Sequence, residues 1–106
     1  MVPISFSFQA KLYLYHGDKA SWTFVTLPMD VADGIRFFTY EKAAKRRGFG
    51  SVKVSVSIGE TSWTTSVFPD KQSGSYLLPI KASVRVAEDI SAGDIVAFSL
   101  SLRDGF

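Results

Sequence analysis

Alternation of apolar and polar positions is the strongest pattern in this sequence. It runs without interruption through residues 51–58 and 95–102, and it extends over a dozen positions in residues 5–16. Successive side chains of a β-strand point to opposite faces of a sheet, so each segment is predicted to be a strand with one buried face. The expected buried positions in residues 51–58 are Val52, Val54, Val56 and Ile58. Those in residues 5–16 are Phe6, Phe8, Ala10, Leu12 and Leu14.

Three further strands are predicted between turn residues. Residues 21–27 are partly apolar on both faces, which is typical of a central strand, and they follow a turn in which Gly17 is free to take a positive φ. Residues 61–68 are expected to form a hairpin with the strand before them, because the connecting Gly-Glu pair suits a type II′ turn. A short strand over residues 75–78 follows a loop that is expected to be exposed.

One helix is predicted over residues 31–42. Val31, Ile35 and Phe38 recur at the spacing of one helix face and are expected to be buried. Asp30 is expected to be the N-cap of this helix, because its carboxylate can accept hydrogen bonds from free amides of the first turn.

Residues 80–89 are compatible with both a strand and a helix. Ile80, Val84 and Ala87 fit a helical stripe, whereas the alternation from Ile80 to Val86 fits a strand. The β-branched residues favour a strand, but periodicity alone leaves both structures open. A Gly-Asp turn at residues 93 and 94 then leads into the last strand.

Composition limits the classes of protein and of chemistry. The chain of 106 residues is predicted to be a single domain over residues 1–106, with enough hydrophobic residues, 46%, to form a core. It contains no cysteine, which excludes disulfides, a thiolate nucleophile and cysteine-based metal sites. No segment approaches the roughly 20 apolar residues that span a bilayer, and the N-terminus shows no leader pattern, so we expect no membrane association and a cytoplasmic location. The net charge of +2 is too small to indicate a polyanionic partner by itself.

Three stretches of the sequence together resemble a known family. They read S-W-T-F-V-T-L-P-M-D-V-A at residues 21–32, V-K-V-S-V-S-I-G-E-T-S-W-T-T-S-V at residues 52–67, and Y-L-L-P-I-K-A-S-V-R-V-A-E-D-I-S-A-G-D-I-V-A-F-S-L at residues 76–100. In this order they resemble a prokaryotic family of small domains of unknown function, some members of which are fused to a bacteriocin-protection, OmpD-associated domain.

The resemblance implies an all-β fold, a small double-split β-barrel of about six to seven strands with one or two short helices. Its architecture is similar to that of the swapped-hairpin barrels of AbrB-type regulators. The resemblance also implies a short helix at about residues 81–88, and it offers no catalytic residues. Whether the chain is a monomer or a homodimer stays open.

Catalytic chemistry finds little support among the polar residues. The single histidine, His16, stands at a strand end without the partners that a catalytic triad requires. Asp18, Asp70 and Asp94 each lie in a turn close to a glycine, and turn formation explains them without a metal ion. No glycine-rich phosphate-binding motif occurs. We therefore expect a non-enzymatic binding module with no cofactor and no metal site.

A cluster of cations is the first candidate binding feature. Its members are Lys42, Lys45, Arg46 and Arg47. The simpler interpretation is a solvated helix end, where cations complement the helix dipole. The alternative is a nucleic-acid-binding or regulator-like barrel, in which this basic loop contacts phosphates and Trp63 and Tyr76 stack on bases.

A small-molecule pocket in the barrel is the second candidate. Its opening is expected to be lined by Trp22, Phe24, Trp63 and Tyr76. Small barrels usually fill their interior with side chains, which weighs against such a pocket. Arg85 is either a ligand-facing guanidinium or, in the simpler interpretation, the partner of Asp94 in a half-buried ion pair. A protein-interaction surface is a third class that the sequence leaves open.

Overall fold

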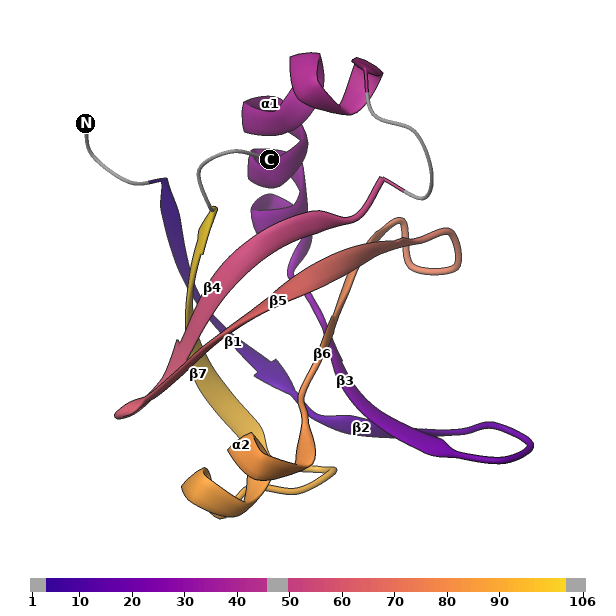
Figure 1. Ribbon diagram of the computed structural model, residues 1–106, viewed down its shortest axis with the longest axis vertical. Coiled ribbons are helices and arrows are strands. Elements are labelled where there is room, and N and C mark those ends of the chain that lie inside the picture. The colour runs from indigo at the N-terminus through magenta and orange to yellow at the C-terminus, as the bar shows by residue number, and fades with distance from the viewer. Residues whose placement is uncertain (1–3, 46–49, 103–106) are drawn as a thin grey trace.

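The computed structural model describes residues 4–45 and 50–102 and shows a curled antiparallel sheet with two helices (Figure 1). The strands in these residues are β1 (Ser5–Lys11), β2 (Tyr13–His16), β3 (Ser21–Thr26), β4 (Val52–Ile58), β5 (Thr61–Asp70), β6 (Ser75–Pro79) and β7 (Ile95–Leu102). The helices are α1 (Met29–Lys45) and α2 (Ala82–Glu88). The sheet order is β1-β7-β4-β5-β6-β3-β2. The predicted class, an all-β small barrel of six to seven strands with one or two helices, is confirmed.

The sheet curls because two long segments each pair with both of its halves, one half containing β4 and β7 and the other containing β3 and β6. From Thr61 to Val67, β5 pairs with β4, and from Phe68 to Asp70 it pairs with β6. The first segment of the chain behaves in the same way, since β1 pairs with β7 and β2 pairs with β3. The two halves are therefore connected along one side by β5 and along the other by the continuous chain from β1 to β2.

Leu12 is the residue at which the first segment changes partner. Its amide donates a hydrogen bond to the Asp94 carbonyl oxygen at 2.9 Å, and its own carbonyl accepts one from the Gly93 amide at 2.8 Å. Its side chain is only 1% exposed. Beyond this point β2 leaves the body of the barrel in the hairpin with β3 (Figure 1).

The prediction that Leu14 belongs to the buried face is wrong. All four residues of β2 are exposed, and Leu14 keeps 43% of its surface accessible. In the described residues β2 is an edge strand that pairs only with β3. The alternation of β2 therefore predicts a strand correctly, but it does not predict that another layer covers one face of that strand. A period of two by itself does not specify which segments lie over a core.

The central strands bury the faces that the sequence predicts. The buried residues of β4 are Val52, Val54, Val56 and Ile58, and those of β7 are Val96, Phe98, Leu100 and Leu102. The hairpin from β4 to β5 opens with Gly59 at a φ of 55°, as the predicted turn requires of its first central residue. β3 pairs with β2 on one side and β6 on the other, which confirms that it is not an edge strand.

Helix α1 is longer than predicted, and of the three residues expected to be buried Val31 and Ile35 are buried. It begins at Met29, and its first backbone bond runs from the Ala32 amide to the Pro28 carbonyl, so Asp30 lies inside the first turn and is not the N-cap. Phe38 is 48% exposed, so the prediction that it is buried is wrong. Thr39 is buried in its place, because its hydroxyl donates to the Ile35 carbonyl at 2.7 Å and loses no hydrogen bond on burial.

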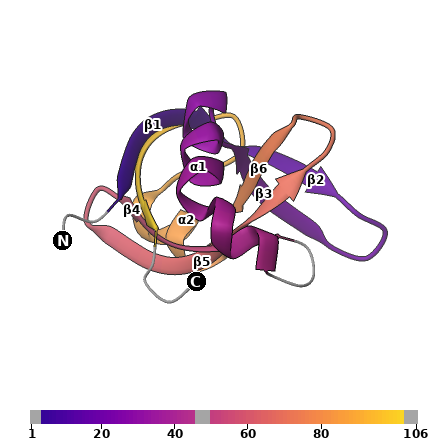
Figure 2. The ribbon, with the colours of Figure 1, turned by 90° about the horizontal axis from the view of Figure 1, so that it is seen from above.

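Arg36 connects α1 to the turn between β5 and β6. Its guanidinium donates to the Asp33 carboxylate at 2.9 Å and to the Gly74 carbonyl, and it lies 5.6 Å above the centre of the Tyr76 ring. Seen from above, the strands curve around α1, which lies over one end of the barrel (Figure 2). This contact therefore holds the covering helix to the sheet.

Helix α2 resolves the ambiguity of residues 80–89 in favour of the helix that the family resemblance implied. Val84 is its buried residue, at 2% exposure. The helix ends at Asp89, which adopts the left-handed conformation with a φ of 53°. Near its end, Glu88 accepts a hydrogen bond from the Thr61 hydroxyl at 2.5 Å, which fixes the helix to the hairpin of β4 and β5.

We expect Leu12→Ala to lower the free energy of unfolding by about 2–5 kcal/mol, because it leaves a cavity at the point where the chain changes partner. Leu14→Ala is the matched control and should change it by less than about 0.5 kcal/mol, because Leu14 is exposed. Urea unfolding of both variants measures the two values. Equal losses would contradict the assignment of Leu12 as the packed switch point.

Candidate functional site

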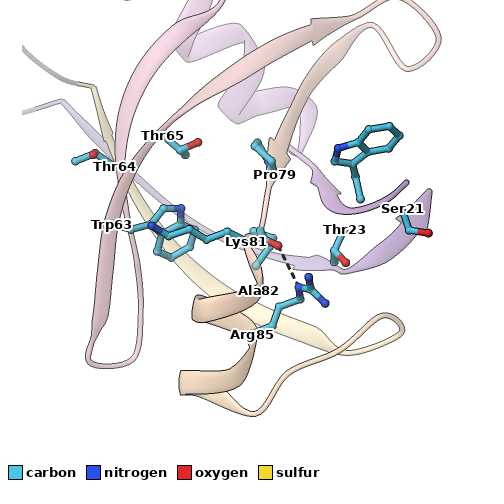
Figure 3. Close-up of a pocket in the computed structure, with 11 residues that line it drawn as sticks. Ser21, Thr23, Trp63, Thr64, Thr65, Pro79, Lys81, Ala82 and Arg85 are labelled. Atoms are coloured by element: carbon cyan, nitrogen blue, oxygen red, sulfur yellow. Dashed lines mark hydrogen bonds between the residues drawn. The ribbon is translucent and has the colours of Figure 1, made fainter. Parts of the chain in front are cut away.

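A pocket of about 390 Å³ opens between β3, β5 and the segment that leads into α2. Figure 3 shows Trp63, Thr64 and Thr65 on β5 at one side and Ser21 and Thr23 on β3 at the other. The segment between them contributes Pro79, Ile80, Lys81, Ala82 and Arg85. The pocket therefore combines three parts of the chain that lie far apart in the sequence.

The two tryptophans of the sequence both line this pocket. Trp63 is 8% exposed and belongs to the core side of β5, whereas Trp22 is 48% exposed and lies on the projecting hairpin. One indole thus forms a buried wall and the other remains accessible at the mouth. Of the four aromatic residues predicted to line an opening, these two are brought together.

Gly17 sets the position of the Trp22 ring. A Cβ atom at Gly17 would lie 2.7 Å from Cζ3 of Trp22, which is closer than two carbon atoms approach. The Trp22 ring also packs against Tyr15, with ring centres 5.9 Å apart. Gly17 does not adopt a positive φ, so the predicted reason for this glycine is wrong. The lack of a side chain allows close approach of the indole, and it also leaves room for the Ala20 carbonyl, which a Cβ would meet at 3.1 Å.

Arg85 lies beside the pocket with part of its guanidinium occupied. Its Nε donates to the Ile80 carbonyl at 3.2 Å, and the side chain is half-buried. The expected ion pair with Asp94 is not formed, because the Asp94 carboxylate accepts a hydrogen bond from the Ser91 amide at 2.9 Å within the turn. The Nη atoms of Arg85 make no hydrogen bond with the residues that the structure describes.

Two nearly buried donors also reach the pocket. Thr23 is 5% exposed and Trp63 is 8% exposed, yet neither the hydroxyl nor the indole N–H has a hydrogen-bond partner within the described chain. No fully buried side-chain nitrogen or oxygen in that part of the chain lacks a partner, so these two groups keep some accessible surface. Donors of this kind are expected to bind an acceptor from outside the protein.

The other two predicted aromatic residues lie elsewhere. Tyr76 is 7% exposed and its ring lies under Arg36 of α1. Phe24 packs against Tyr13, with ring centres 6.1 Å apart. Neither residue lines the pocket. The burial of Tyr76 also leaves no open ring face on which a nucleic-acid base could stack.

The described members of the predicted basic cluster, Lys42 and Lys45, do not line this pocket. Lys42 and Lys45 belong to the last turns of α1, at the opposite end of the molecule from α2 (Figure 1). Arg46 and Arg47 lie outside the described residues. The structure therefore does not place the cluster next to Trp63, Tyr76 or Arg85, and phosphate contact through it stays a prediction.

The candidate acidic residues serve turns. Asp70 accepts a hydrogen bond from the Ser73 amide at 3.1 Å, and hydrogen bonds from the Ser73 hydroxyl and from the backbone hold the pKa of its carboxyl below the usual value. His16 is exposed, and its Nδ1 lies 3.3 Å from the Ser21 hydroxyl. Among the described residues, no group of three or more His, Cys, Asp or Glu side chains could hold a metal ion.

A curled small barrel with an open, tryptophan-lined pocket is thus the class that fold and site define. The chain belongs to the family described as Domain of unknown function (DUF1905), whose model matches residues 8–100. The membership agrees with the small domain of unknown function that the sequence resembles. No curated protein matches the chain. In the described residues, neither helix has the length and apolar character needed to cross a membrane.

We expect Gly17→Ala to displace the Trp22 ring, because the new methyl group would overlap with the indole. The tryptophan fluorescence spectrum should shift, while the free energy of unfolding should change by no more than about 1 kcal/mol, since the ring is half-exposed and able to move. Lys19→Ala in the same turn is the control and should leave the spectrum unchanged. An unaltered spectrum for Gly17→Ala would contradict the role given to this glycine.

Proposed function

We propose that this domain is a binding module that holds a small organic molecule in the pocket between β3, β5 and α2 and does not transform it. The observation that carries the proposal is the presence of two unpaired, nearly buried donors, the Thr23 hydroxyl and the Trp63 indole N–H, in one open pocket. Both donors are accessible, so an acceptor group of a ligand can replace the water that would otherwise bind to them.

The dimensions and chemistry of the pocket support this proposal. Its volume of about 390 Å³ falls in the range of about 300–1,000 Å³ that is usual for small-molecule sites. Indole rings supply apolar contact area, and a few hydroxyl and cationic groups are available to orient a ligand. The hydrophobic core draws on strands β3 to β7 and on both helices, and Trp63 and Ile80 belong to this core as well as to the pocket lining.

Binding without chemistry is supported by the residue types at the pocket. The described residues that line it include no Asp, Glu or His, which are the side chains that most often act as general acid or base. The hydroxyl groups of Thr23, Thr64 and Thr65 have no Asp, Glu or His beside them among the lining residues. The Ser21 hydroxyl, which also lines the pocket, lies 3.3 Å from Nδ1 of His16, but both residues are exposed and no acid orients the imidazole in the described residues.

Intrinsic fluorescence provides a direct test, because the two tryptophans of the sequence are both at the pocket. A panel of small aromatic compounds of neutral, anionic and cationic character should include members that change tryptophan emission in a saturable way and raise the melting temperature. Mass action predicts stabilisation of about 2.7 kcal/mol at a ligand concentration one hundred times Kd.

Two substitutions on α2 locate the binding event. Ala82 and Ala87 are both exposed on this helix, but only Ala82 lines the pocket. We expect Ala82→Phe to reduce affinity at least about tenfold by occupying ligand volume, whereas Ala87→Phe should leave it unchanged. The absence of saturable binding across the whole panel would overturn the proposed function. Equal loss in both variants would place the ligand outside this pocket.

A further inference from the structure

The charges at the pocket have one sign. Lys81 and Arg85 are the only charged residues among the described residues that line it, and both are cationic. In Figure 3 the Lys81 side chain extends towards Trp63 on β5, whereas the Arg85 guanidinium lies on the side of Thr23 and β3. No carboxylate at the pocket neutralises them, and among the described residues Arg85 makes no ion pair with an acid elsewhere.

The hydrogen bond of Arg85 orients its free donors. Because Nε is occupied by the Ile80 carbonyl, drawn as the dashed line in Figure 3, the guanidinium plane is held by the backbone. The edge formed by the two Nη atoms remains, and this edge matches the two oxygens of a carboxylate. Lys81 is exposed and its side chain extends away from the Arg85 guanidinium, so it adds positive charge to the pocket without sharing the contact.

The apolar part of the pocket favours a flat ligand. Trp63 forms the buried wall and Trp22 the accessible one, and indole rings pack best against planar groups. The indole N–H of Trp63 and the hydroxyl of Thr23 supply further donors, so the lining is rich in donors and poor in negative charge.

We propose that the ligand is a planar aromatic carboxylate, with its ring against the two indoles and its carboxylate on the free edge of Arg85, and that Lys81 contributes attraction through its charge without direct contact. This inference rests on the proposed function, because it names the ligand class for the same pocket. Recognition of the anion comes from charge-assisted hydrogen bonds, and selection of the ring comes from packing against Trp63 and Trp22.

The test compares a naphthalene carboxylate with the matching naphthalene carboxamide, which has the same shape without the charge. Binding is followed by tryptophan emission of the intact domain. We expect the carboxylate to bind at least about tenfold more tightly, since a hydrogen bond to a charged group contributes this much. A saturated bicyclic carboxylate, which keeps the charge but is not planar, should bind more weakly than the aromatic one.

Variants assign the charge preference to the two cations. Arg85→Gln and Lys81→Gln should each reduce the preference for carboxylate over carboxamide, with the larger loss for Arg85→Gln because its guanidinium is oriented by Ile80. Lys71→Gln, in the exposed turn after β5, removes the same charge away from the pocket and should leave the preference intact. If Arg85→Gln fails to fold, Lys81→Gln still tests the inference, because Lys81 is exposed.

The outcomes separate this inference from the proposed function. Equal binding of carboxylate and carboxamide, or binding of neutral compounds only, would overturn the carboxylate assignment and leave a small-molecule site. A naphthyl phosphate that binds while the carboxylate does not would also overturn it in favour of another oxyanion. No binding by any compound of the neutral, anionic and cationic panel would overturn both.

Discussion

The fold depends on the change of partner at Leu12. The amide and the carbonyl of this residue are both hydrogen-bonded to the turn of Gly93 and Asp94, and its side chain is almost fully buried. Before Leu12 the chain pairs with β7, and after it the chain pairs with β3. The continuous segment from β1 to β2 thereby joins two halves of the sheet that, in the described residues, do not hydrogen-bond to each other along that side. On the opposite side the same two halves are joined by β5.

The same constraint positions the pocket. The turn that binds Leu12 lies between α2 and β7, so the short chain that closes the barrel also carries Lys81 and Arg85. Glu88 of α2 is bonded to Thr61 at the start of β5, only two residues before Trp63. The cationic side of the pocket and its buried indole are consequently held in one rigid arrangement, and only Trp22, on the hairpin, lies on a more exposed element.

Part of the candidate site could be found from the residue types. Trp22, Trp63 and Arg85 stand out in the sequence as large aromatic or charged residues, and the structure brings them to one pocket. Tyr76 has the same appearance in the sequence, but it packs under Arg36. Nothing in the sequence marks Lys81 and Thr23 as pocket residues, because their place at the pocket depends on where α2 and β3 lie in the fold. Gly17 was noticed for its flexibility, although its lack of a side chain is what matters.

The sequence by itself determined where most strands lie and which faces of β4 and β7 are buried, because side-chain alternation follows directly from strand geometry. Periodicity left helix and strand both open for residues 80–89, and only the resemblance implied the helix; the tertiary structure shows the helix, with Val84 buried while Val86, which a strand would place on the same face, is 81% exposed. It also decided that Leu14 and Phe38 are exposed while Thr39 is buried. Burial depends on what lies opposite a face, and that information is distributed over segments far apart in the chain.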